Sequence, residues 1–322
     1  MNIRLLLLPL FACLVPAAGG TWATPVPVPE ARTPHASVAL VAEQVTAARG
    51  MTTWVGLRFR LQPRWHIYWQ DPGDSGCPPS IARELPGGVG AGDIRWPTPK
   101  RLPVGPLTNF GHTGEVTLAV PISVPAAFAA GELRLLARAL AGLRGSVHSR
   151  IGDARAPAAG VGRPPPRPGA GRRLFAEARA RWPAVAAPAG WRLSAARHNS
   201  GVSLRLETPS AVVIDAASFF PFDEELMDAA AEQTLQRQGQ AQVLELRAAA
   251  VPVAPWTRLA GVLVVQAAGA GSGGPGQSFV VELPLAAAVT ARSSPALSAG
   301  QAPAGVERAS PAGRSKPGSI QT

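Results

Sequence analysis

Two cysteines, Cys13 and Cys77, are the residues of this chain best suited to covalent chemistry. Thiol–disulfide exchange requires two neighbouring sulfurs, one to attack and one to resolve the mixed disulfide. Cys13 lies in an N-terminal apolar run that has the features of a secretory signal. If that signal is removed, Cys77 remains alone, and a lone thiol in an exported protein forms no internal disulfide. The sequence therefore predicts one mature thiol, Cys77, and no internal disulfide.

The other reactive residue types are predicted to be structural. Asp71 and Asp74 flank Pro72-Gly73, where carboxylates ordinarily cap turns. Ser75 follows Asp74, but it lacks the strand–turn–helix setting of a hydrolase nucleophile. No pair of histidines has a metal-ligand spacing and no cysteine cluster accompanies them, so neither a metal nor a cofactor is expected. The five histidines are His35, His66, His112, His148 and His198.

The N-terminal residues predict export. Arg4 precedes an apolar run from Leu5 to Ala18, and small residues follow it, which is typical of a signal peptide over residues 1–23. The apolar run is shorter than the about 20 residues that cross a bilayer. Leu10-Phe-Ala-Cys13 offers the alternative of a lipoprotein cleavage box, which Phe11 fits poorly.

Apolar and polar residues alternate in several short segments, as in half-buried strands. Clear cases are Val55 to Leu61 and Val116 to Val124. With 34 glycines and 34 prolines for turns, this pattern predicts an all-β fold of antiparallel sandwiches. We expect one sandwich over residues 35–140 and a second over 175–288. Short helical pieces are expected at Phe175–Trp182 and near Asp223–Ala231.

Two further segments have a different composition. Residues 141–174 are rich in Arg, Pro and Gly and predict a linker, and residues 289–322 predict a disordered tail. The formal net charge is +11, mostly from arginine. Because the arginine-rich segment lacks interleaved aromatic residues and any nucleic-acid-binding motif, no nucleic-acid partner is expected.

The stretch from Trp65 to Ile122 resembles the N-terminal periplasmic region of the DsbD/ScsB-like protein-disulfide reductase (thiol:disulfide interchange) family. The matching residues are Trp65-His-Ile-Tyr-Trp69, Asp71-Pro-Gly-Asp-Ser-Gly76, Pro78-Pro79, Trp96-Pro-Thr-Pro99, Val104-Gly-Pro-Leu-Thr-Asn-Phe-Gly111 and Gly114-Glu-Val-Thr-Leu-Ala-Val-Pro-Ile122. A weaker resemblance continues to residue 287.

The resemblance implies immunoglobulin-like sandwiches in the periplasm. It implies a cysteine pair that passes reducing equivalents to thioredoxin-like or disulfide-isomerase partners and to cytochrome c biogenesis. A separate membrane electron-transfer domain would supply the electrons. Asn109, Phe110 and Gly111 resemble the family's cap loop, which shields the cysteine pair.

The chain departs from the family where the cysteine pair belongs. Ala139 to Arg150 occupy that place and contain no cysteine. Divergence is one explanation. The other is an offset reading frame, because Gly142 to Arg150 can be encoded so that the next frame reads Ala-Cys-Val-Glu-Ala-Cys-Ile-Pro. We therefore expect an interchange module that is inactive as written. The alternative is a non-catalytic β-sandwich adaptor that binds periplasmic redox or membrane partners through the surface around Phe110.

Overall fold

The computed structural model describes residues 30–44, 46–128, 131–133, 136–143, 146–155, 159–162, 171–209, 212–224, 226–250, 257–268 and 276–286. The predicted signal peptide, Cys13 and the predicted tail lie outside these residues. The chain divides into two units, Met1–Ala288 and Val289–Thr322, and every described residue belongs to the first. No helix among the described residues is long and apolar enough to cross a membrane.

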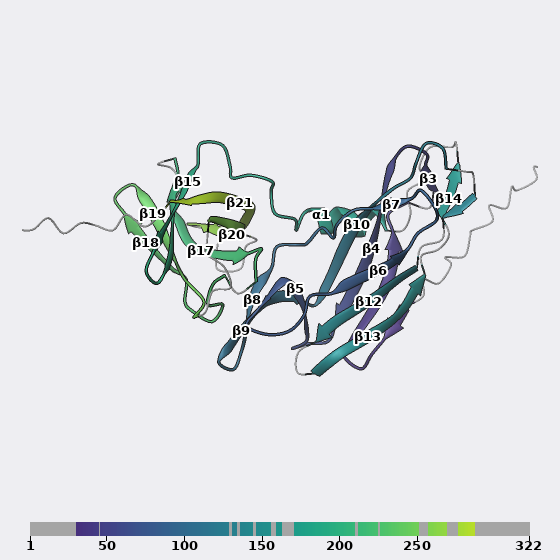
Figure 1. Ribbon diagram of the computed structural model, residues 1–322, viewed down its shortest axis with the longest axis horizontal. Helices are drawn as coiled ribbons and strands as arrows, with labels where there is room; N and C mark the ends of the chain where they lie inside the picture. The colour runs from purple at the N-terminus through teal and green to yellow at the C-terminus, as the bar shows by residue number, and fades with distance from the viewer. Residues whose placement is uncertain are drawn as a thin grey trace, which may run out of the picture. The chain divides into compact units, whose positions relative to one another are not determined.

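The first sheet is built from the segments whose alternation is clearest. Its order is β1-β2-β4-β10-β7, and its central strands pair antiparallel, with Leu118 opposite Leu57 (Figure 1). One face of this sheet buries Leu57, Phe59 and Leu118 in the core of this part. The bounds are β1 Glu30–Arg32, β2 Ala36–Ala42, β4 Thr52–Leu61, β7 Gly90–Ala91 and β10 Glu115–Ser123.

The only helix among the described residues, α1 (Arg172–Arg179), covers the other face of this sheet. Its Phe175 is fully buried against Gly56, where an added Cβ would lie 3.1 Å from the Phe175 ring. A glycine in β4 thus leaves room for the aromatic ring. The prediction of a helix at Phe175–Trp182 is confirmed, although the helix begins earlier and ends at Arg179.

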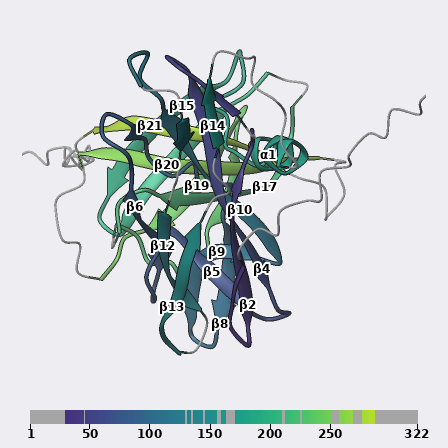
Figure 2. The same ribbon diagram turned by 90° about the vertical axis from the view of Figure 1, so that its right-hand side faces the viewer.

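A second sheet carries the motif-rich stretch. Its order is β13-β12-β5-β9-β8, with β6 paired to β12, as the neighbouring β5, β12 and β13 in Figure 2 show. The bounds are β5 His66–Gly73, β6 Ser80–Glu84, β8 Lys100–Val104, β9 Leu107–Thr113, β12 Leu136–Leu143 and β13 Ser146–Arg155. A small third sheet joins β11 (Gly131–Leu133), β14 (Ala159–Gly162) and β3 (Thr46–Ala48).

The structure differs from the predicted linker over residues 141–174. The described part of this segment contains the end of β12, β13, β14 and the first three residues of α1. β12 pairs with both β13 and β6, so its backbone hydrogen bonds are satisfied within the sheet. Composition misled the prediction because strand pairing uses backbone groups, which Ala, Gly and Arg supply as well as any other residue.

The C-terminal sheet has the order β17-β20-β21-β15-β16-β19-β18. Its core contains Leu204, Phe219, Leu263 and Phe279. The helical piece expected near Asp223–Ala231 is wrong for the described residues, because Asp228 Oδ1 accepts the N–H groups of Ala230 and Ala231 in a turn. The bounds are β15 Arg192–His198, β16 Gly201–Glu207, β17 Ile214–Pro221, β18 Thr234–Gln238, β19 Ala241–Arg247, β20 Arg258–Ala267 and β21 Gln277–Ala286.

The prediction of a mainly β fold is therefore confirmed. Nearly all described strand pairs are antiparallel, the exceptions being β14 with β3 and β15 with β21. The finer assignment to immunoglobulin-like sandwiches stays a prediction.

Candidate functional site

The end of β5 and the residues after it form a turn that leads to Cys77. It begins at Asp71-Pro-Gly73, where Gly73 has a φ of +79° that L side chains rarely adopt. Asp71 Oδ1 accepts the Gly73 N–H at 2.9 Å. The Asp74 N–H donates to the Thr108 carbonyl, and Asp74 Oδ2 accepts the Thr108 N–H at 2.7 Å. The prediction that carboxylates cap this turn is confirmed for Asp71, whereas the Asp74 carboxylate bonds to Thr108 and so ties the turn to β9.

The Tyr68 ring packs against the turn at Gly76. An added Cβ at Gly76 would lie 2.1 Å from the Tyr68 ring, so only glycine allows this approach. The Ser75 hydroxyl donates to Asn109 Oδ1 at 3.0 Å, which is a second connection between the turn and β9. Ser75 therefore links the loop to β9.

Cys77 ends this turn as an exposed free thiol. Burial raises the pKa of the Tyr68 phenol, and the negative charge of a Cys77 thiolate raises it further. The described residues include no other cysteine and no group of three metal-ligating side chains. A single thiol can form a mixed disulfide with another molecule, but a second sulfur must resolve it. The described part of the chain offers no such resolving group.

Asp71 is the most strongly perturbed acid near this turn. Its residue is 3% exposed, and burial raises the pKa of its carboxyl to about 7. The Gly73 N–H opposes that rise, while the negative charges of Glu224 and Asp74 add to it. Sequence reasoning assigned Asp71 to a turn and missed this shift, because the burial comes from residues far away in the chain.

The three residues that resemble a cap loop lie inside strand β9. Asn109 and Phe110 are 2% and 0% exposed. The Phe110 ring lies 5.1 Å from that of Phe220, at an interplanar angle of 79°. Gly111 pairs with Tyr68, and an added Cβ there would lie 2.3 Å from the Ile67 carbonyl oxygen. The cap role stays a prediction, but the expected binding surface around Phe110 is wrong, since this side chain is buried.

Sequence reasoning also missed a cluster of cationic and histidine side chains formed by Lys100, His112 and Arg181. Their positive charges and the buried imidazole interact although the residues are far apart in the sequence. No local motif identifies them. The only signal was the position of Lys100 after Trp96-Pro-Thr-Pro99, which does not by itself indicate a site.

Comparison with solved structures shows the fold. The N-terminal periplasmic domain of ScsB from Proteus mirabilis matches with a TM-score of 0.57 and 16% identity, covering 79% of this chain and 97% of that one. A protein of unknown function from Porphyromonas gingivalis W83 matches with a TM-score of 0.19 and 12% identity, covering 76% and 96% of the two chains. No curated protein matches the chain.

The residues that match a known family include the turn after β5, the buried Trp69 and Phe110, and β10. Residues 37–140 match the family described as thiol:disulfide interchange protein DsbD, N-terminal. The resemblance of Trp65–Ile122 is thereby confirmed. A DsbD N-terminal domain is thus identified over residues 37–140 of the chain.

Proposed function

We propose that this chain is an exported, periplasmic interchange module of the DsbD/ScsB kind that lacks its own redox pair. The observation that carries the proposal is a DsbD N-terminal domain at residues 37–140 in a sequence whose only cysteines are Cys13 and Cys77. The family role is to pass reducing equivalents to periplasmic thiol-redox partners. Immunoglobulin-like sandwiches, a signal peptide over residues 1–23 and a separate membrane electron-transfer domain belong to the same proposal.

The chemistry explains why the chain is inactive alone. A thiolate attacks a partner's disulfide, one S–S bond forms as another breaks, and a partner thiolate leaves. A second thiolate must then attack the mixed disulfide, which releases the reduced partner and leaves the carrier oxidised. Cys77 supplies the first sulfur only. Transfer stops at the mixed disulfide unless another molecule provides the second sulfur.

A coupled reduction assay tests the proposal. The purified mature chain is mixed with a reduced thioredoxin-like donor and an oxidised disulfide-isomerase partner, and partner thiols are counted over time. We expect no turnover above a protein-free control, and the same result with Cys77→Ser. Sustained turnover by the unaltered chain would refute the proposal.

The nucleotide sequence of codons 130–180 separates divergence from an offset frame. Within this range, the codons of Gly142 to Arg150 could encode the cysteines in an offset frame. They cover the end of β12 and the start of β13, where Leu143 pairs with both Ser146 and Ile67 of β5. The hairpin thus runs beside the motif-rich strand. If neither shifted frame encodes cysteines there, the offset-frame explanation is excluded and divergence remains.

The alternative function is that of a non-catalytic adaptor for periplasmic redox or membrane partners. Since Phe110 is buried, the surface proposed to bind the partner is instead the tip of the β8–β9 hairpin, where Leu107 is 40% exposed. Pull-down from periplasm distinguishes it from the first proposal. A partner retained by the chain and by Cys77→Ser but lost with Leu107→Asp supports the adaptor, whereas no retained partner counts against it.

A further inference from the structure

A cleft of about 800 Å³ opens between the start of β8, the residues after α1, and strands β17, β20 and β21. This volume is within the range of small-molecule sites, about 300–1,000 Å³. Its lining combines cations with apolar side chains. The residues that matter are Lys100, His112, Glu115, Arg181, Phe220 and Val264.

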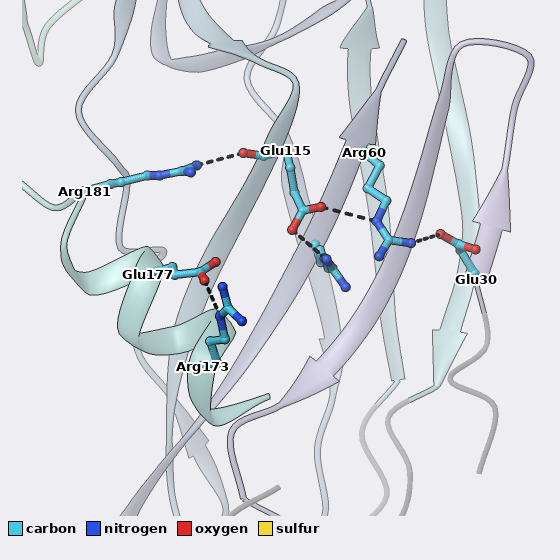
Figure 3. A network of polar contacts seen from close by, with 7 residues as sticks. Glu30, Arg60, Glu115, Arg173, Glu177 and Arg181 are labelled. Carbon is cyan, nitrogen blue, oxygen red and sulfur yellow. Dashed lines mark hydrogen bonds and ion pairs between the residues drawn. The ribbon is translucent and has the colours of Figure 1, made fainter. Parts of the chain in front are cut away.

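The charge of the cleft is positive because its acid is already paired. Glu115 is the one carboxylate among the described lining residues. Its Oε1 accepts from Arg58 Nη2 at 2.6 Å, and its Oε2 lies 3.3 Å from Arg60 Nε. Figure 3 shows the Glu115 side chain turned toward Arg60. The carboxylate therefore leaves the cations of the cleft uncompensated.

Arg181 and Lys100 are these cations. Arg181 Nη1 donates to the Glu115 carbonyl oxygen at 2.8 Å, which fixes its position at the cleft wall (Figure 3). No ion pair of Lys100 or Arg181 is found among the described residues. Arg101, the third cation of the lining, already donates to the Ala229 and Ala231 carbonyls.

His112 adds a buried polar atom without a partner. The residue is 6% exposed, and its Nε2 has no hydrogen-bond partner in the described part of the chain. Burial, helped by the charges of Lys100 and Arg181, lowers its pKa to about 3, so the imidazole is neutral. A neutral ring nitrogen can donate to an acceptor in one of its tautomers. Leaving such a nitrogen unpaired in the interior is unfavourable.

We propose that this cleft binds a small organic anion with a phosphate or carboxylate head and an apolar body. The head lies at Lys100 and Arg181 and accepts a hydrogen bond from His112. The body packs against Phe220 and Val264. A bare inorganic ion would fill only a small part of the volume, and the apolar lining is suited to a larger molecule.

Calorimetric titration of the full mature chain tests the site with phenyl phosphate, benzoate, inorganic phosphate and the neutral benzyl alcohol. We expect one of the two aromatic anions to bind at least about tenfold more tightly than benzyl alcohol and than inorganic phosphate. The tighter aromatic anion identifies the head group. Lys100→Gln should weaken its binding by about tenfold, because one charge-assisted contact is lost.

Arg173→Gln is the matched control. It removes the same charge from an exposed side chain of α1 that pairs with Glu177 and does not line the cleft. Its affinity should equal that of the unaltered chain. Equal losses in Lys100→Gln and Arg173→Gln, binding of benzyl alcohol or inorganic phosphate as tight as that of the aromatic anions, or no binding of any probe would each overturn the proposal.

Discussion

Asp71 and His112 are both buried, and burial moves their pKa values in opposite directions. Removal from water disfavours the charged form of either group. The carboxyl is therefore easier to keep protonated, and the imidazole is harder to protonate. At the residue scale, these shifts convert into opposite dependences of stability on pH.

For Asp71 the native pKa, about 7, exceeds the ordinary value of 3.8 for an aspartate carboxyl. The native state thus binds the proton more tightly, and stability falls as pH rises from about 4 to about 7. Asp71→Asn keeps an oxygen for the Gly73 N–H but removes the charge. We expect it to match the unaltered chain near pH 4 and to exceed its free energy of unfolding near pH 8 by up to about 4 kcal/mol.

Guanidinium unfolding at the two pH values measures this difference. Asp93→Asn, which changes an exposed carboxyl, serves as the control and should show no such pH-dependent gain. If Asp71→Asn is less stable than the unaltered chain at both pH values, ionisation of the buried Asp71 carboxyl does not destabilise the folded chain, and the prediction fails.

His112 should behave in the opposite way. Its native pKa of about 3 is below the ordinary histidine value of 6.5, so stability is lost as pH falls through that range. The direct expectation is that its imidazole signals do not titrate between about pH 5 and pH 8. NMR of the ring protons, assigned with His112→Asn, measures this. A midpoint within that range would contradict the burial described for this residue.

Cys77 gives the third prediction at this scale. The thiol is exposed, so the mature chain should gain a single carbamidomethyl group from iodoacetamide without denaturant. Intact-mass spectrometry counts the groups, and Cys77→Ser should gain none. A second group on the unaltered mature chain, before or after reduction, would show that the mature chain carries a second reactive thiol and would contradict the prediction.

At the scale of elements, the hairpin of β8 and β9 connects two parts of the first unit, the N-terminal sheets and the C-terminal sheet. Arg101 in β8 donates to the carbonyl oxygens of Ala229 and Ala231 at 2.8 and 2.9 Å. Burial lowers the pKa of its guanidinium, while the negative charges of Asp74 and Asp228 oppose that effect. Two acceptors in the segment after β17 thus depend on one side chain.

We expect Arg101→Met to lower the free energy of unfolding by about 2 kcal/mol, because two partly buried carbonyl groups lose a charged donor. Faster hydrogen exchange should be concentrated in residues 226–233. Arg192→Met, an exposed arginine of β15, is the control and should leave both measurements unchanged. Uniform exchange changes across the chain would argue against a local role for Arg101.

At the scale of the whole molecule, an aromatic cluster joins residues far apart in the chain. Trp69 and Phe110 pack with Phe220, Ala229 and Val262. The Phe220 ring lies 6.2 Å from that of Trp69 and 5.1 Å from that of Phe110. Such edge-to-face contacts add to the free energy gained by burying the rings.

Phe220→Ala should therefore cost about 3–5 kcal/mol of unfolding free energy, through lost burial and the cavity left behind. Denaturant unfolding followed by tryptophan fluorescence reports on the cluster through Trp69. Val185→Ala is the control, because Val185 is 93% exposed. A loss below about 1 kcal/mol in Phe220→Ala would mean that the two parts are not stabilised by this cluster.

The sequence by itself determined the strands with clear alternation, the turn capped by Asp71, and the resemblance of Trp65–Ile122 to the DsbD N-terminal region. These features depend on local periodicity, local hydrogen bonds and a dense motif. Tertiary structure decided the rest. It placed strands in the Ala/Arg-rich segment, because pairing partners such as β6 lie far away in the sequence. It buried Phe110 beneath Phe220 and brought Lys100, His112 and Arg181 together, since burial and long-range electrostatics arise only once distant segments pack.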